Sequence, residues 1–205
     1  MPLYKTIYPK KNTTVLVWEI TENLSYLKDI ELNTNSLNRL ANMKSEMHKK
    51  GFLSIRHLLK ELGYNDDDLF YTSNGKPHLK DGKRISITHS FDFSAIIVSD
   101  NIVGIDIEKN RQKIVKIAPK FIGEEKKHLN QNHLIEQLTV IWGAKESLYK
   151  IHPDGGLLFK KHLPIEAFKL ADKQTIGWIK KDNFYEKYHI HFTKIKEYSL
   201  VYALN

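Results

Sequence analysis

Two acidic residues stand two positions apart in residues 103–108, which read Val-Gly-Ile-Asp-Ile-Glu. Apolar residues alternate there with small or acidic ones, which is the period of a half-buried β-strand. Residues two apart share one face of a strand, so Asp106 and Glu108 should project together, with Cα atoms about 6–7 Å apart. Such a pair suits Mg²⁺, which is typically held by one or two carboxylates and substrate phosphates. An ordinary strand end with its acidic face in water is the alternative that this short segment leaves open.

Residues 134–150 contain further charged residues that could join this chemistry. Apolar residues at 134, 138, 141 and 148 form a helical stripe, which 135, 142 and 149 extend. In this register Lys145 and Glu146 point toward the packed side rather than toward water. Buried charges are normally paired or bound to a metal, so we expect Glu146 to be a third carboxylate that meets Asp106 and Glu108. An i,i+4 ion pair of Glu146 with Lys150 is the alternative, and it does not explain the apolar face.

These segments together resemble the signature of the 4′-phosphopantetheinyl transferase superfamily, in its larger, surfactin-synthetase-activating type. The signature is (V/I)-G-(I/V)-D-x-E followed by W-x-x-K-E-[SA]-x-x-K, and residues 103–108 and 142–150 fill every diagnostic position. Upstream, residues 74–79 (Asn-Gly-Lys-Pro-His-Leu) resemble the family's G-K-P-x-L box. Residues 87–90 (Ile-Thr-His-Ser) resemble a box in which serine usually precedes histidine, so Thr88 is a departure.

The resemblance implies an enzyme that transfers 4′-phosphopantetheine from coenzyme A, its co-substrate, to a serine of an apo carrier protein with the help of Mg²⁺. Asp106, Glu108 and Glu146 would hold the metal against the pyrophosphate, and Lys150 would reach the same phosphates. The serine proton would pass to Glu146, to Glu125 or to a metal-bound water. Glu125 ends an F-x-x-x-E segment that family members often carry near the metal. The alternative is that Glu125 is an ordinary acidic residue in the first turn of a helix.

Residues before position 100 would bind coenzyme A if the resemblance holds. Lys76 of the G-K-P box would bind a phosphate, and Thr88 and His89 would contact the nucleotide portion. Arg56 lies on the basic polar face of an expected helix and is the candidate for the 3′-phosphate. The alternatives are a solvated loop lysine, a structural histidine and a solvated helix face.

The composition is that of a globular protein, with 205 residues of which 41% are hydrophobic and 27% charged. No run of 18 apolar residues and no basic-then-apolar leader is visible, so we expect neither a membrane span nor a signal peptide. The absence of cysteine excludes disulfides and thiol chemistry and agrees with a cytoplasmic location, which we predict. A net charge of +8 favours acidic partners such as nucleic acid, anionic lipid, a polyanionic cofactor or an acidic protein.

The elements that position these residues follow an order of strand, long helix and antiparallel strands that occurs twice. We expect a first buried strand at residues 14–20 and a helix from Ser36 to Leu62, with Ser36 as its N-cap, Gly51 as a candidate interruption and Gly63 as its stop. Residues 94–99 and 102–108 predict a hairpin around the turn at 100–101. Further strands are expected at 165–170, 175–179, 187–193 and 198–204.

We therefore predict an α+β fold with an N-terminal half, residues 1–100, and a C-terminal half, residues 101–205, that carries the metal site. Two similar α/β halves related by a pseudo-twofold, with the active site between them, are what the resemblance implies. Family members of half this size assemble the site between subunits, so a chain that holds both halves should be a monomer.

Two alternative functions remain open at this point. A metal-dependent phosphodiesterase acting on nucleic acid would use the same carboxylates and positive charge. A non-catalytic basic binding module would need only the charge. The ordered motifs favour the transferase, with an apo acyl, peptidyl or aryl carrier protein as its partner and neither nucleic acid nor a membrane. Carrier proteins are typically acidic, which fits the positive charge.

Overall fold

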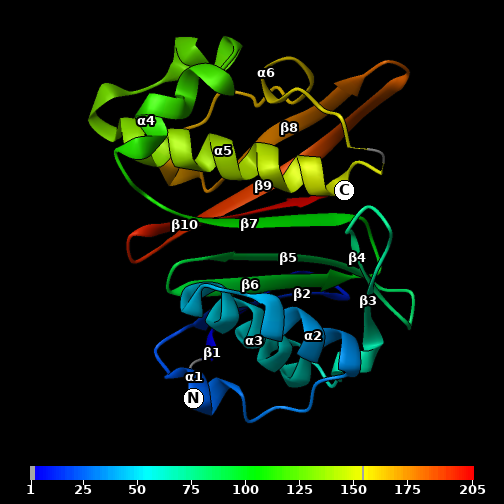
Figure 1. Cartoon of the computed structure of the whole chain (residues 1–205). Helices are drawn as coiled ribbons and strands as arrows, with labels where there is room; N and C mark the ends of the chain where they lie inside the picture. The colour runs from blue at the N-terminus through cyan, green and yellow to red at the C-terminus, as the bar shows by residue number, and fades with distance from the viewer. Residues whose placement is uncertain (1–2, 154) are drawn as a thin grey trace. The chain divides into compact units, whose positions relative to one another are not determined.

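The computed structural model describes residues 3–153 and 155–205. The chain divides into two units, Met1–Asn101 and Ile102–Asn205. Each unit combines helices with a four-stranded antiparallel sheet (Figure 1), which confirms the mixed α/β class expected from the sequence. Among the described residues, no helix has the length and apolarity that crossing a membrane requires. The pseudo-twofold relation stays a prediction.

The first unit is built on a sheet of strand order β1-β2-β6-β5, with a separate β3-β4 ribbon. Its elements are β1 (Leu3–Lys10), β2 (Thr13–Glu19), α1 (Leu24–Leu27), α2 (Thr34–Asn42), α3 (Glu46–Glu61), η1 (Asp66–Asp68), β3 (Leu69–Tyr71), β4 (Pro77–Leu79), β5 (Arg84–Ser90) and β6 (Phe93–Ser99). Helix α3 places Ile55, Leu58 and Leu59 on one stripe, and this stripe packs in one core with Ile96 and Val98 of β6.

The long helix expected from Ser36 to Leu62 is in fact two helices, α2 and α3. Residues 43–45 separate them, because Met43 and Ser45 have extended backbone. Ser45 begins α3 as its N-cap and accepts a hydrogen bond from the backbone N–H of His48 at 3.4 Å. Apolar periodicity continues across the break, so the sequence pattern does not reveal it.

The expected boundaries of that helix are correct at one end only. The N-cap of α2 is Asn33, and the predicted cap Ser36 lies inside the helix as a buried residue. Gly51 lies within α3 and does not interrupt it. Gly63 follows the C-cap with a φ of +82°, a conformation that glycine adopts readily, and so stops the helix as predicted.

The second unit has a sheet of strand order β7-β10-β9-β8, and α5 lies across one face of it (Figure 1). Its elements are β7 (Val103–Lys109), α4 (Lys113–Ile117), η2 (Ala118–Lys120), η3 (Glu124–His128), η4 (Gln131–His133), α5 (Leu134–Ile151), α6 (Phe159–His162), η5 (Leu170–Asp172), β8 (Gln174–Lys181), β9 (Phe184–Ile195) and β10 (Tyr198–Leu204). The helix at 134–150 and the strands at 175–179, 187–193 and 198–204 are thereby confirmed.

Two expectations about strands are wrong, whereas the buried strand expected at 14–20 is confirmed as β2, although it is not the first strand of the chain. β6 and β7 do not pair as a hairpin, because β6 belongs to the sheet of the first unit and β7 to that of the second. Residues 165–170 form no strand, and Ile165 makes only an isolated bridge with Gly177. The first buried strand, β2, is preceded by β1, a largely exposed edge strand whose pattern carries little apolar alternation.

Candidate active site

Strand β7 meets helix α5 through a glycine. A Cβ atom at Gly104 would lie 2.0 Å from the carbonyl oxygen of Ser147, a separation that no side chain could tolerate. Glycine therefore lets the strand approach the helix backbone directly. Side chains alternate along a strand, so Asp106 and Glu108 share the face of Gly104 and are turned toward α5, as the sequence predicted.

Asp106 is held against α5 by two features of that helix. A Cβ at Gly143 would lie 3.6 Å from Oδ2 of Asp106 and 2.8 Å from Cγ2 of Val201, so the missing side chain leaves room for the carboxylate. The Lys150 Nζ donates to Oδ1 of Asp106 at 3.0 Å and to the carbonyl oxygen of Ile105 at 2.7 Å. Asp106 is only 5% exposed. The Lys150 ammonium thus offsets the charge of a buried carboxylate.

Glu146 lies one turn before Lys150 and is electrostatically coupled to the same cluster. Burial raises the pKa of the Glu146 carboxyl to about 7, and the negative charge of Asp106 adds to the rise. Lys150 acts in the opposite direction, and Glu108 raises the pKa further. The Glu146 carboxyl is therefore coupled electrostatically to both Asp106 and Glu108, and their common role in one site stays a prediction.

The donor chemistry of these three carboxylates fits a hard divalent cation, because Mg²⁺ prefers oxygen ligands and offsets their mutual repulsion. Within the described ranges, no group of three or more His, Cys, Asp or Glu side chains is already close enough to enclose an ion. The short contact of Asp106 is with Lys150 instead. The metal role of each residue therefore stays a prediction.

Glu125 lies in another environment from the one expected. Its side chain is 5% exposed and forms an ion pair with Nζ of Lys145 at 2.6 Å. The carboxylate also accepts hydrogen bonds from the backbone N–H groups of Gly123 at 2.7 Å and Ile165 at 3.1 Å. Because its oxygens are engaged in this way, Glu125 holds loop segments together, and this environment does not favour the expected role at the metal or as the general base.

The expected coenzyme A residues lie in the first unit. Lys76 follows the turn of the β3-β4 ribbon, where its backbone pairs with Thr72. Thr88 and His89 are on β5, with Thr88 buried and His89 exposed. His89 lies against α3, since a Cβ at Gly51 would be 3.0 Å from its ring. The sequence analysis missed His48, whose ring centroid is 6.1 Å from that of His89. His48 lies about one helical turn before Gly51, and no motif in the sequence marks it as a neighbour of His89.

Arg56 has a structural environment that the sequence did not suggest. Its side chain is 4% exposed and pairs through Nε with Oδ1 of Asp66 at 3.0 Å. The guanidinium also donates to Ser36 Oγ at 3.2 Å and to the carbonyl oxygen of Phe52 at 3.3 Å, and it stacks on the Phe52 ring. A guanidinium buried in these contacts is not available to a phosphate, so placing Arg56 on a polar helix face was wrong.

Comparison with known proteins agrees with this geometry. Residues 102–203, about half of the chain and nearly all of the second unit, match the model of the 4′-phosphopantetheinyl transferase superfamily. The matched range contains β7 and α5 with Asp106, Glu108, Glu146 and Lys150. The chain belongs to this superfamily.

Two curated proteins extend the comparison. The chain is 29% identical over 154 residues to the 4′-phosphopantetheinyl transferase gsp of Aneurinibacillus migulanus, which covers 72% of this chain and 63% of that protein. It is 30% identical over 112 residues to enterobactin synthase component D of Salmonella typhimurium, which covers 52% of this chain and 47% of that protein. The chain therefore spans less than two thirds of either relative. Neither comparison supports the phosphodiesterase alternative.

Proposed function

We propose that the chain transfers 4′-phosphopantetheine from coenzyme A to a serine of an apo carrier protein in an Mg²⁺-dependent reaction. The observation that carries this proposal is the contact of Lys150 with Asp106 between α5 and β7, beside Glu146 and within the matched range. Membership of the superfamily and the name of the gsp relative support the same reaction.

The residues of the second unit would act on the pyrophosphate of coenzyme A. Asp106, Glu108 and Glu146 would hold Mg²⁺, which when bound neutralises charge on the phosphoanhydride oxygens. Lys150 reaches the same region from α5 and would stabilise the negative charge that develops on the departing 3′,5′-ADP. Glu125 is engaged elsewhere, so we propose Glu146 as the side chain that would accept the serine proton.

The nucleotide portion of coenzyme A would be bound by residues of the first unit. Lys76 stands at a turn, where its ammonium can make charge-assisted hydrogen bonds to a phosphate. His89 is exposed and would contact the nucleotide through a ring nitrogen, and the neighbouring Thr88, which is buried, stays a predicted contact of the nucleotide.

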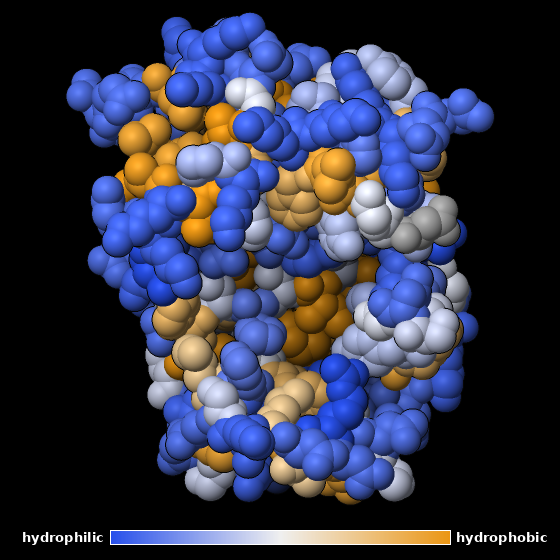
Figure 2. Space-filling model, turned by 45° about the horizontal axis from the view of Figure 1, so that its top comes forward, coloured by the Kyte–Doolittle hydropathy of each residue, from blue (hydrophilic) through white to orange (hydrophobic). Residues whose placement is uncertain are grey.

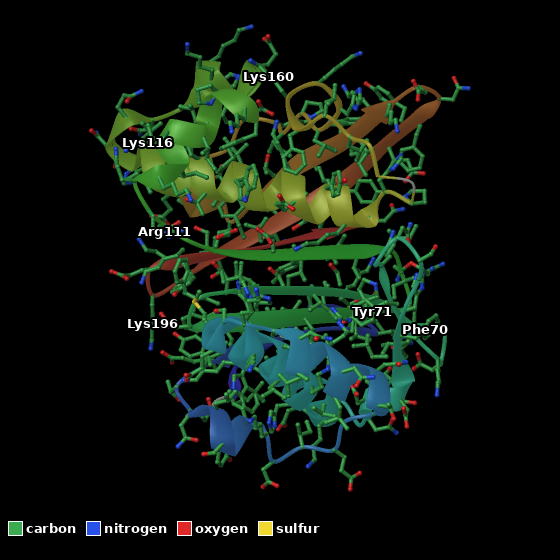
Figure 3. The ribbon with its side chains drawn as sticks, viewed as in Figure 1. Phe70, Tyr71, Arg111, Lys116, Lys160 and Lys196 are labelled. Atoms are coloured by element: carbon green, nitrogen blue, oxygen red, sulfur yellow. The ribbon has the colours of Figure 1, made fainter. Side chains whose placement is uncertain are left out.

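We propose an acidic carrier protein as the second substrate. Arg111, Lys116, Lys160 and Lys196 are exposed on the second unit and project outward from it (Figure 3). The face shown in Figure 2 is largely hydrophilic, with apolar patches between polar side chains. The four basic side chains suit an acidic partner, since complementary charge speeds encounter. A monomeric state and a cytoplasmic location stay predictions from the sequence.

Mass spectrometry of an apo carrier protein incubated with the chain, coenzyme A and Mg²⁺ tests the proposal. The carrier should gain the mass of one phosphopantetheine, and a carrier whose acceptor serine is replaced by alanine should gain none. EDTA should abolish the gain. No mass gain on any acyl, peptidyl or aryl carrier would overturn the proposed function, and equal labelling in EDTA would overturn its metal dependence.

A further inference from the structure

Lys145 and Glu125 form a buried ion pair beside the candidate site, and the mechanism above uses neither residue. The Lys145 side chain is fully buried and the Glu125 side chain is 5% exposed. Lys145 Nζ also donates to the carbonyl oxygen of Phe159 at 3.1 Å. Through Glu125 the pair reaches the backbone N–H groups of Gly123 and Ile165. It therefore joins three segments of the second unit: α5, the start of η3 and the chain from α6 to residue 165.

An aromatic cluster covers α5 next to this ion pair. The ring of Phe159 packs on Trp142 and on Tyr149, with centroid separations of 5.2 and 5.6 Å, and Phe121 packs edge-on against Trp142 at 5.0 Å. Phe159 is the residue whose carbonyl accepts from Lys145. The polar link and the aromatic contacts thus fix the same segment onto the outer side of α5.

Contacts on two sides of α5 determine how the helix is rotated about its axis. On the sheet side, Gly104 and Gly143 bring the helix backbone close to β7 and β10. On another side, Lys145 is anchored to Glu125 and Phe159. Consecutive residues of a helix are about 100° apart, so Glu146 lies between the directions of Lys145 and Ser147. Fixing both neighbours therefore fixes the direction in which the Glu146 side chain leaves the helix.

We propose that Lys145 and Glu125 are positioning residues, whose buried ion pair sets the rotation of α5 and so aims Glu146 at Asp106 and Glu108. A buried ion pair adds little net stability, because apolar side chains of similar volume at the same positions often give an equal or higher free energy of unfolding. It does specify one geometry, since charge-assisted hydrogen bonds are directional. This inference rests on the proposed function for its activity readout but not for its binding readout.

The test replaces the pair by neutral side chains of similar length in the full chain, as Glu125→Gln with Lys145→Met. The matched control is Glu136→Gln with Lys194→Met, which removes the ion pair of 3.0 Å that joins α5 to β9 in a more exposed place. For each protein, Mn²⁺ affinity in the presence of coenzyme A is measured by electron paramagnetic resonance. Transfer kinetics and urea unfolding are recorded in parallel.

Loss of a residue that orients a metal ligand typically costs about 10–100-fold in metal affinity or activity. The Glu125/Lys145 double variant should therefore lose Mn²⁺ affinity and kcat on that scale, with KM for coenzyme A changed by less than about twofold. The control should match the unaltered protein. If the double variant does not fold, Glu125→Asp is measured, which keeps both charges but shortens the side chain that holds Lys145, and it should show the same losses to a smaller degree.

A folded variant with unchanged Mn²⁺ affinity and kcat would overturn the proposal, whatever its stability, because the pair would then be structural only. Equal losses in the control would overturn it as well. Absence of transfer by the unaltered chain would contradict the proposed function, while the Mn²⁺ titration would still decide whether the pair aims Glu146.

Discussion

The backbone of Ser147 lies so close to Gly104 that a Cβ at position 104 would come within 2.0 Å of its carbonyl oxygen. This contact joins the two elements that carry the candidate site, because β7 bears Asp106 and α5 bears Glu146 and Lys150. The neighbouring atoms are backbone rather than the end of a flexible side chain. A larger residue therefore has to push the helix away from the strand.

Gly104→Ala should accordingly destabilise the protein by on the order of 1–3 kcal/mol or more, as overpacking in a core does. Urea unfolding followed by circular dichroism measures this loss. Catalytic turnover should fall as well, since the displaced helix carries Glu146. If the alanine variant is as stable as the unaltered protein, β7 and α5 do not approach each other as closely as described.

Lys76→Ala and His89→Ala should each raise the apparent KM for coenzyme A. Each removes charge-assisted hydrogen bonds to phosphate, on the order of 1–3 kcal/mol. Lys80→Ala is the control, because Lys80 is an exposed lysine of the same region outside the expected boxes. Steady-state kinetics at saturating carrier protein gives the three values. If all variants have the same KM for coenzyme A as the unaltered protein, Lys76 is a solvated loop residue and His89 a structural one.

Asp66→Asn should weaken the first unit strongly while leaving coenzyme A binding intact. Asp66 is the buried partner of Arg56, and removal of one member of a buried pair typically costs about 3–5 kcal/mol. Arg56 contributes to the fold rather than to phosphate binding, so KM for coenzyme A should be unchanged at a temperature where the variant is folded. The ligand role itself is tested by Arg56→Gln under the same conditions, and a tenfold rise in KM for that folded variant, on the order of 1.4 kcal/mol, would restore Arg56 as a coenzyme A ligand.

The stability contributed by Asp81 should depend on pH. The Tyr64 hydroxyl donates to Asp81 at 2.7 Å, and this hydrogen bond holds the pKa of the Asp81 carboxyl below its usual value. A carboxyl with a lowered folded-state pKa adds stability above the unfolded pKa, about 3.9, and loses it as pH falls through the folded value.

Tyr64→Phe removes the donor, so its deficit in unfolding free energy should be largest near neutral pH and should shrink below about pH 4. Urea unfolding of both proteins across this pH range measures the deficit. A gap between the two proteins that is independent of pH would show that the hydrogen bond does not favour the ionised carboxylate.

The elements that the sequence predicted most clearly are those with a strong local periodicity of apolar residues. Strand β7 and helix α5 have strong patterns, and the motif spacing tied Asp106, Glu108 and Glu146 to one chemistry. The prediction of a hairpin between β6 and β7 was wrong because a turn signal such as the one at 100–101 indicates a chain reversal but not which sheet each strand joins. β1 was missed because an exposed edge strand needs no apolar alternation.

Partners that are distant in the chain could not be predicted from periodicity. The register of α5 showed that Lys145 is turned inward, but not that its partner is Glu125, twenty positions earlier in the short 3-10 helix η3. The burial of Arg56 was missed for a similar reason, since Asp66 lies beyond the end of α3. A helical pattern identifies a buried face, while the choice of ionic partner depends on how the loops pack.

The central claim is that the carboxylates of β7 and α5 act together in one transfer reaction, and kcat for Glu146→Gln, Asp106→Asn and the double variant tests it most directly. Each single change keeps the side-chain size and removes a charge that the proposed metal site requires, so turnover should collapse while circular dichroism stays native. Residues that act as a unit are non-additive, so the double variant should be little worse than either single one. A folded Glu146→Gln protein with near-normal turnover would contradict the claim.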